Sequence, residues 1–297
     1  MTTVSVASGK GGAGKTSIAA ALADTLGSAC VFADCDVDAA NGAIALGASI
    51  VTREPYFAGP GFIIEESACS GCGACVAACR FNAIEPVPGA ATFRIVQELC
   101  ERCGACMIQC PTKAITTFQK LAGELYVSDT SMGIRLVHAE LEPGEDTSGK
   151  LVAKVRKRAE QEAKADSILV VDAPPGIGCP VIASITGCDL LVIVIEASAS
   201  GIRDAARLIE LAISMKRRCL GLINKAGLNV IMDKRAKAML ADAGIPLAGQ
   251  IPFDTALRSI EESNRTWASL DAQSSDSTSI AEIQATLAAI KNALDTL

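Results

Sequence analysis

The 297-residue chain carries 27 basic and 33 acidic side chains, a formal net charge of −6, and half of its residues are hydrophobic. It can bury a substantial core, and its length favours about two domains. An acidic balance and 3% aromatic residues are unfavourable for general nucleic-acid binding, so no nucleic-acid partner is expected. The chain has no signal pattern and no long uncharged apolar run, which predicts a soluble, cytoplasmic protein without a membrane span.

Short aliphatic runs bounded by turn residues alternate with helical patterns along most of the chain. Strands are expected at 3–7, 30–33, 167–171, 189–195, 219–223 and 247–251. Helices are expected at 15–27, 150–165, 201–217, 229–243 and 278–296. This alternation predicts an α/β fold with a doubly wound, mostly parallel sheet. Segment 118–149 is ambiguous, with 124–127 and 133–138 as candidates for two additional strands.

The first predicted strand leads into a glycine-rich loop that matches the pattern G-x4-G-K-[ST]. The loop consists of Gly9, Lys10, Gly11, Gly12, Ala13, Gly14, Lys15 and Thr16, and Ser17 follows it. Glycines let successive backbone N–H groups point at phosphate oxygens, and the helix that opens at Lys15 adds a favourable potential for anions. We expect Lys15 to reach the β- and γ-phosphates of a nucleotide and Thr16 to ligate Mg²⁺. The alternative is a glycine-rich turn without a ligand.

Because Lys10 precedes the invariant part of the pattern, the loop resembles the deviant Walker A form of the MinD/ParA/nitrogenase-iron-protein ATPase family. The resemblance covers essentially the whole chain outside a cysteine-rich block. It implies a P-loop NTPase that binds and hydrolyses ATP as a homodimer or as a heterodimer with a related ATPase. It also implies that Lys10 reaches the partner's nucleotide, where it adds positive charge at the transition state.

Other positions match the family's remaining motifs in order. Asp36 matches the switch I carboxylate that orients or deprotonates the attacking water and contacts Mg²⁺ through water. Asp172 matches the Walker B acid that holds a Mg²⁺ water, and Gly176 matches the switch II glycine that senses the γ-phosphate. Asn224 matches the position that reads the adenine edge, and Pro252 lies in the loop that lines the same pocket. With the loop from Gly9 to Ser17, these positions form the expected ATP and Mg²⁺ site, with Lys10, Lys15 and Asp36 as its catalytic residues.

Eight of the thirteen cysteines lie in two runs that repeat after 31 residues. The runs are Cys69, Cys72, Cys75 and Cys79, and then Cys100, Cys103, Cys106 and Cys110. Flanking apolar residues repeat with them, so 62–117 is predicted to be a duplicated insertion in an α/β domain formed by 1–61 and 118–297. A long chain without a secretion signal favours metal or redox ligation over disulfides.

The duplicated pattern C-x2-C-x2-C-x3-C resembles the two-cluster bacterial ferredoxins, in which the last cysteine of each run ligates the other cluster. The resemblance implies an α+β ferredoxin-like domain with two [4Fe-4S] clusters. It assigns one cluster to Cys69, Cys72, Cys75 and Cys110, and the other to Cys100, Cys103, Cys106 and Cys79. Paired zinc sites are the alternative. Cys179 follows Asp172 by seven residues, the spacing at which the nitrogenase iron protein places a ligand of its dimer-bridging cluster.

The combination resembles MinD-superfamily P-loop ATPases that carry an inserted ferredoxin domain. The insertion lies between the two segments that respond to the γ-phosphate, which favours coupling between nucleotide state and the clusters. The expected function is ATP hydrolysis coupled to electron transfer toward, or maturation of, a partner metalloprotein. Two alternatives stay open: an iron–sulfur carrier or scaffold, and a redox-sensing positioning ATPase of the MinD/ParA type.

Overall fold

The computed structural model describes residues 1–145, 149–257, 265–270 and 277–297. It divides into two compact units, each described by itself here. The sheet unit comprises Met1–Glu54, Leu125–Glu140 and Thr147–Leu297, and the cysteine unit comprises Pro55–Glu124 and Leu141–Asp146. Two long strands, β3 (Ala48–Ile64) and β6 (Ile115–Thr130), contribute residues to both units.

The sheet has the strand order β11-β10-β9-β1-β8-β2-β7-β6-β3. Its remaining strands are β1 (Thr2–Ala7), β2 (Cys30–Asp34), β7 (Arg135–Leu141), β8 (Ile168–Asp172), β9 (Leu190–Glu196), β10 (Cys219–Ala226) and β11 (Leu247–Pro252). The pairs from β11 through β7 are parallel. The predicted doubly wound, mostly parallel sheet is therefore confirmed, and its strands lie within a few residues of the predicted ranges.

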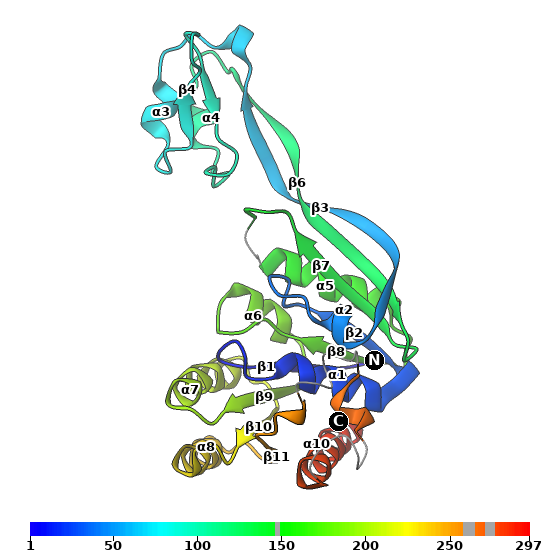
Figure 1. Ribbon diagram of the computed structural model, residues 1–297. Coiled ribbons are helices and arrows are strands. Elements are labelled where there is room, and N and C mark those ends of the chain that lie inside the picture. Colours follow the sequence, from blue (N-terminus) through cyan, green and yellow to red (C-terminus); the bar gives the residue numbers. More distant parts are fainter. Residues whose placement is uncertain (146–148, 258–264, 271–276) are drawn as a thin grey trace. The chain divides into compact units, whose positions relative to one another are not determined.

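Helices cover both faces of this sheet (Figure 1). Strand β9 explains why, because its side chains alternate between two apolar clusters. Leu190, Val192 and Val194 pack in the cluster that includes α1 (Lys15–Leu26) and α10 (Ser277–Asp295). The residues between them pack in the cluster that includes α6 (Cys179–Ile185), α7 (Ala199–Ser214) and α8 (Val230–Asp242). Both faces of the strand are therefore apolar, as its uninterrupted aliphatic sequence predicts.

All five predicted helices occur, with ends shifted by a few residues. They are α1 (Lys15–Leu26), α5 (Gly149–Glu162), α7 (Ala199–Ser214), α8 (Val230–Asp242) and α10 (Ser277–Asp295). In the described part of the sheet unit, two short α-helices were not predicted, α2 (Gly42–Ala45) and α6 (Cys179–Ile185). Helix α6 follows a segment rich in proline and glycine, which indicates a loop, and a proline in its first turn is compatible with helix initiation. Among the described helices none is long and apolar enough to cross a membrane.

The ambiguous segment 118–149 supplies β6 and β7, which neighbour each other in the sheet. Tyr126 on β6 and His138 on β7 stack with ring centroids 5.0 Å apart, and Ser128 lies within hydrogen-bond distance of the His138 ring. The predicted strands at 124–127 and 133–138 were too short, and β3 was not predicted. Most residues in the first part of β3 are exposed, and its apolar residues Ile50 and Val51 are adjacent and do not alternate with polar ones. That stretch therefore lacks the apolar pattern of a buried or half-buried strand.

The cysteine unit contains α3 (Ala74–Ala78), α4 (Ala105–Gln109) and an antiparallel pair, β4 (Ile84–Pro86) and β5 (Phe93–Ile95). Its backbone follows the sequence repeat. Gly73 and Gly104 precede the two helices with φ of 72° and 75°, and Asn82 and Lys113 share φ of 52° and 54°. Each half therefore wraps its cysteines with the same left-handed turns.

The cysteine unit is larger than the predicted insertion at 62–117. It takes in further parts of β3 and β6, and also the segment Leu141–Asp146. The Glu145 carboxylate in that segment forms ion pairs with Arg102 and Lys120. Sequence spacing could not predict these contacts, because the partners lie 43 and 25 residues apart along the chain.

Candidate functional site

The glycine-rich loop lies between β1 and α1 and requires its glycines. A Cβ on Gly9 would lie 2.3 Å from the backbone carbonyl carbon of Asp204, a distance that real Cβ atoms do not show. Gly12 and Gly14 have φ of 75° and 92°, in the left-handed region. Gly11 and Gly12 are exposed, while Ala13 is buried. The loop thus presents its backbone to solvent directly before α1, which suits an anion.

The two residues that open α1 contact carboxylates from two neighbouring strands. The Lys15 ammonium lies 3.3 Å from Oδ2 of Asp36, and the Thr16 hydroxyl donates to Oδ2 of Asp172 at 2.6 Å. The Cys35 backbone N–H donates to the Asp172 carbonyl at 2.9 Å, which ties the segment after β2 to β8. The predicted lysine, hydroxyl and both carboxylates therefore come together at the carboxyl ends of the parallel strands. Ser17 is half-buried in the first turn of α1.

The carboxylates at this edge lie in an environment that disfavours their charge. Burial raises the pKa of Asp172 to about 6, against the lowering effects of the Lys15 charge and the Thr16 hydrogen bond. Burial and the Asp172 charge also raise the pKa of Asp34, which accepts backbone hydrogen bonds from Asp36 and Gly42. Among the residues that the structure describes, Oδ1 of buried Asp172 has no hydrogen-bond partner. An oxygen of this kind beside the Thr16 hydroxyl suits a hard divalent cation such as Mg²⁺.

Asn224 faces the glycine-rich loop from the end of β10. Its Nδ2 donates to the Ala13 carbonyl at 2.8 Å, and a Cβ on Gly14 would lie 2.3 Å from that nitrogen. Pro252, at the end of the neighbouring strand β11, is half-buried and pairs in register with Ala226. Both predicted base-pocket residues thus belong to the two strands that end beside the loop, and Asn224 contacts the loop directly.

Lys10 is held within its own chain. Its ammonium lies 2.7 Å from Oε1 of Glu196, while the Lys225 ammonium lies 3.0 Å from Oε2 of the same carboxylate. Lys225 also donates to the Gly12 carbonyl at 2.7 Å. Burial raises the pKa of Glu196, but its hydrogen bonds to Lys10, Lys225 and Ser198 outweigh this effect and the net pKa is lowered. Glu196 and Lys225 were not predicted as site residues, because the predicted strands end one and two residues before them.

Gly176 lies on the other side of the loop, in the segment between β8 and α6. Its N–H donates to the Ser8 carbonyl at 3.0 Å, and its φ of 99° requires glycine. The segment is thereby attached to the residue that precedes the glycine-rich loop. Cys179 begins α6 three residues later and is exposed.

In the cysteine unit, one set of four cysteines lines a small cavity that is open to solvent. The four are Cys69, Cys72, Cys75 and Cys110. Cys75 is buried and Cys72 is exposed. Side chains of Ile64, Phe93 and Ile115 complete the apolar wall. The structure therefore gathers three cysteines of the first run and the last cysteine of the second run.

The other set lines a second small cavity. Its cysteines are Cys79, Cys100, Cys103 and Cys106. Phe62 and Ile95 form part of the apolar wall, and Arg102 adds a charged residue. In the described part of the chain, no group of three or more His, Cys, Asp or Glu side chains converges on a single metal position. The cysteines instead surround two cavities, each with sulfur donors that suit iron or another soft metal.

The fold and the loop define a P-loop nucleotide-binding protein. The family model described as the CobQ/CobB/MinD/ParA nucleotide binding domain matches residues 4–267, and the chain belongs to this family of MinD/ParA-type P-loop ATPases. An uncharacterized protein of Methanocaldococcus jannaschii is 34% identical over 236 residues, which cover 77% of this chain and 79% of that protein.

Solved structures support the fold. The septum site-determining protein MinD of Pyrococcus horikoshii, complexed with Mg-ADP, superposes with a TM-score of 0.58 at 15% identity, covering 97% of this chain and 95% of that one. The Cyanothece McdA(D38A)-ATP complex also gives a TM-score of 0.58, at 16% identity and with 98% and 96% coverage. These likenesses support the α/β architecture; the cysteine cavities rest on the chain's own residues.

Proposed function

We propose that this chain is an ATP-hydrolysing iron–sulfur protein that couples nucleotide state to electron transfer toward, or maturation of, a partner metalloprotein. One observation carries the proposal. A single polypeptide joins a P-loop with paired carboxylates to two cavities that are each lined by four cysteines. The nucleotide site and the cysteine cavities suit different reactions. Their presence in one chain favours a function in which ATP hydrolysis and cluster chemistry are coupled over a function that uses only one of them.

The nucleotide half is supported by charge and geometry. Lys15 is buried and lies beside Asp36, so a nucleotide phosphate would compete for its ammonium and leave the Asp36 carboxylate available to orient water. Thr16 and the unpartnered oxygen of Asp172 would hold Mg²⁺, whose charge would offset the cost of burying that carboxylate. To sense the γ-phosphate, the N–H of Gly176 would exchange its hydrogen bond to the Ser8 carbonyl for one to the phosphate.

The cysteine half fits two [4Fe-4S] clusters in its donor chemistry and in its grouping. The two sets of four are those that two-cluster ferredoxins use, with the last cysteine of each run in the other set. When bound, such clusters supply one-electron redox chemistry. The surrounding Phe62, Phe93 and Ile95 exclude water and so influence the potential. Paired zinc ions are the competing occupants, and metal and sulfide analysis distinguishes them.

The proposed active form is a dimer. Lys10 would add positive charge to the partner's transition state, as in the MinD/ParA type of ATPase. For this it must exchange its ion pair with Glu196 for the partner's nucleotide. Glu196 keeps Lys225 as a partner after the exchange, so release of Lys10 leaves the carboxylate compensated.

Two other functions have an observation in their favour. Cys72 and Cys103 are exposed, which suits a carrier or scaffold that hands its clusters to an acceptor. The structural likeness to MinD and McdA suits a positioning ATPase whose clusters sense redox state. Transfer of labelled iron to an apo-ferredoxin would favour the carrier. Equal ATP turnover by oxidised and reduced protein would exclude the sensor.

The test uses anaerobically purified protein and two variants of the loop. Lys15→Ala should weaken ATP binding by about 2–3 kcal/mol, because a buried charge-assisted contact is lost, while iron and sulfide contents stay unchanged. Lys10→Ala should retain binding and lose turnover by about 10²-fold or more. Wild-type protein with fewer than two clusters per chain, or with no ATPase activity, would overturn the proposal. Normal turnover of Lys10→Ala would exclude the role of Lys10 across a dimer.

A further inference from the structure

The two cysteine cavities differ at one position that the sequence repeat makes equivalent. Thr112 lines the first cavity two residues after Cys110, and Phe81 lines the second cavity two residues after Cys79. The residue that follows each of them has the same left-handed backbone. A side chain with a hydroxyl group and a side chain with a phenyl ring therefore occupy matching places at the two sites.

The sulfur of Cys110 lies among hydrogen-bond donors. The Ala114 N–H donates to its Sγ at 3.3 Å, and Oγ1 of Thr112 lies 3.7 Å from Sγ, within hydrogen-bond distance for sulfur. A thiolate that binds a metal carries no proton, so the Thr112 hydroxyl is then the donor. Phe81 has no donor group. The contact of Thr112 with Cys110 therefore has no counterpart from the matching side chain of the second cavity.

A hydrogen bond to a ligating sulfur favours the reduced form of an iron–sulfur site. Reduction adds one negative charge to the site, and a donor that points at sulfur stabilises this charge more than it stabilises the oxidised form. Thr112 thus raises the reduction potential of the first site. Because Thr112 is itself exposed, water competes for its hydroxyl, and an effect of a few-fold on the reduction equilibrium is expected.

Formal charges around the two cavities do not offset this difference. Among the described residues, those that line the first cavity include no Asp, Glu, Lys or Arg. Glu101 and Arg102 line the second cavity. The Arg102 guanidinium donates to the Glu145 carboxylate, which also pairs with the Lys120 ammonium at 2.7 Å. The two acids and the two bases compensate each other, so hydrogen bonding to sulfur remains as the difference between the sites.

We propose that Thr112 is a positioning residue that acts through the Cys110 sulfur and makes the first cavity the site that accepts the first electron, an inference that rests on the proposed function. The site takes one electron from a one-electron donor, and the Thr112 proton stays on its oxygen. The second cavity, with Phe81 at the matching position, accepts its electron at a lower potential. An electron that enters at the second cavity therefore passes to the first.

The first test is a redox titration with dithionite, followed by EPR, of anaerobic wild-type protein, Thr112→Val and Thr112→Ser. Valine has the shape of threonine without the hydroxyl, whereas serine keeps the hydroxyl. In wild type the two clusters should be reduced in separate steps. In Thr112→Val the reduction equilibrium of the cluster that is reduced first should fall at least threefold, which is about 28 mV for one electron. Thr112→Ser should retain the wild-type value.

The second test introduces the hydroxyl at the other cavity. Phe81→Thr and Phe81→Val both remove the ring, and only the first adds a donor. Phe81 is 45% exposed, so neither variant removes a buried side chain, and both should bind two clusters. The cluster that is reduced second should be at least threefold easier to reduce in Phe81→Thr than in Phe81→Val. The other cluster should be the same in both.

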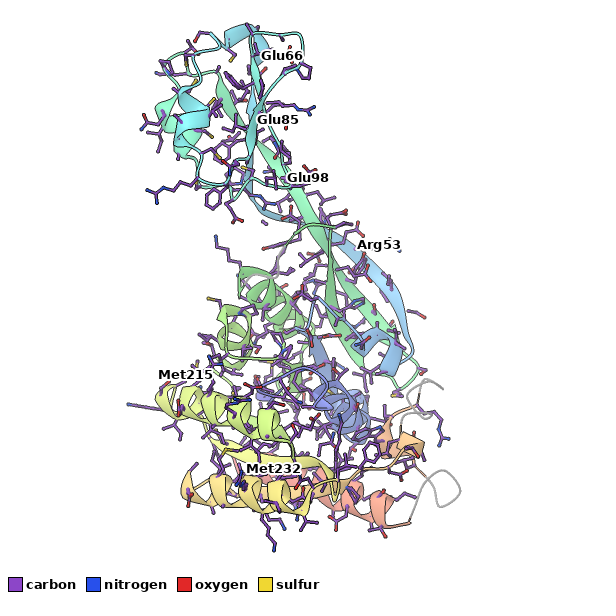
Figure 2. The ribbon with its side chains drawn as sticks, turned by 60° about the vertical axis from the view of Figure 1, so that its left-hand side comes forward. Arg53, Glu66, Glu85, Glu98, Met215 and Met232 are labelled. Carbon is purple, nitrogen blue, oxygen red and sulfur yellow. The ribbon has the colours of Figure 1, made fainter. Side chains whose placement is uncertain are left out.

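Glu85→Gln controls for a general change of charge in the cysteine unit. Glu85, labelled in Figure 2, pairs with Arg94 across β4 and β5, and it is not among the residues that line the two cavities. Both side chains are largely exposed, so water screens them. Glu85→Gln should therefore change both reduction equilibria by less than twofold.

Iron and sulfide analysis of each variant separates the possible outcomes. Equal potentials of the two clusters in wild type, or unchanged potentials in Thr112→Val with both clusters bound, would overturn the inference and leave the proposed function intact. If Thr112→Val loses iron, equal potentials in Phe81→Thr and Phe81→Val would overturn the inference instead. Fewer than two clusters in wild type would contradict the proposed function itself.

Discussion

The sheet unit has a core of aliphatic side chains, whereas the small core of the cysteine unit combines six cysteines with seven apolar residues. In the sheet unit, two apolar clusters cover the two faces of the sheet, and the Ile18 and Leu22 side chains of α1 are fully buried in one of them. In the cysteine unit, Cys75 and Cys106 are buried members of a small cluster with Phe62 and Ile115, and further cysteines pack against it. The sheet unit can bury enough aliphatic surface to be stable, whereas the proposed function makes the stability of the cysteine unit depend on clusters that join its sulfurs.

The sequence features that specify the fold therefore differ between the two units of this chain. In the sheet unit, the pattern of apolar residues specifies the strands and the helices that cover them. In the cysteine unit, elements of three to five residues, such as α3 and β4, cannot be stable by propensity. Their arrangement follows from the left-handed turns around the cysteines, and the proposed clusters would supply folding free energy through metal binding.

Removal of iron should produce the largest difference between the units. Chelation under anaerobic, reducing conditions is expected to abolish hydrogen-exchange protection across 62–117, because the small apolar cluster cannot offset chain entropy without the metal. Protection in β1, β8 and β9 should persist. Loss of protection throughout the chain, or in neither unit, would show that the two units do not differ in this way.

A core truncation in the sheet unit should have the converse effect. Leu22→Ala removes a fully buried side chain from α1 and is expected to lower the free energy of unfolding of this unit by about 2–5 kcal/mol. Ile213→Ala is the matched control on the exposed face of α7 and should change it by less than about 0.5 kcal/mol. Thermal unfolding followed by circular dichroism measures both. Iron content per folded chain should stay the same in each variant.

The buried acid Asp172 should make the stability of the sheet unit depend on pH. Its pKa is raised to about 6 in the fold, so it is protonated in both folded and unfolded states below pH 4 and must ionise inside the fold above pH 6. Without Mg²⁺ and nucleotide, this group therefore destabilises the fold increasingly between pH 4 and pH 6, by up to about 3 kcal/mol. Asp172→Asn should unfold at a higher temperature than wild type at pH 7 and equally at pH 4. A difference in unfolding temperature between Asp172→Asn and wild type that does not change with pH would contradict the assignment of this effect to ionisation of Asp172.

The smallest effect is expected at an exposed ion pair of the cysteine unit. Glu85 and Arg94 face each other across β4 and β5, and both side chains are largely exposed. Glu85→Gln should change the stability of the iron-loaded unit by less than about 1 kcal/mol, because water screens the pair. A larger loss, measured by the rate of iron release, would mean that surface charge and not the cysteines holds this unit together.

Sequence reasoning found most of the fold because the sheet unit follows simple periodicity. Strand β9 is an unbroken aliphatic run, and the glycines from Gly9 to Gly14 mark the loop between β1 and α1. It did not find β3, whose first part is polar, or α6, which follows a segment rich in proline and glycine. An exposed edge strand and a short helix depend on tertiary contacts that periodicity does not encode.

The candidate site likewise contains residues that the sequence predicts and residues that it does not predict. The positions of the predicted residues follow from motifs at the ends of adjacent elements. The structure places Lys15 within hydrogen-bond distance of Asp36, and Thr16 within hydrogen-bond distance of Asp172. Glu196 and Glu145 were missed, because each acts through partners that are distant in sequence. Acids that pair with distant lysines or arginines leave no local pattern. A useful signal would have been the acidic residue at the end of a strand beside the P-loop.

Under the proposed function, ATP binding and the redox state of the cysteine cavities are coupled in one molecule. Redox titration followed by EPR, on anaerobic wild-type protein with no nucleotide, with ADP and with a non-hydrolysable ATP analogue, tests it most directly. We predict two [4Fe-4S] signals, one of which shifts by at least about 59 mV with the ATP analogue, a tenfold change in equilibrium. Two intact clusters with potentials that do not depend on nucleotide would contradict the claim.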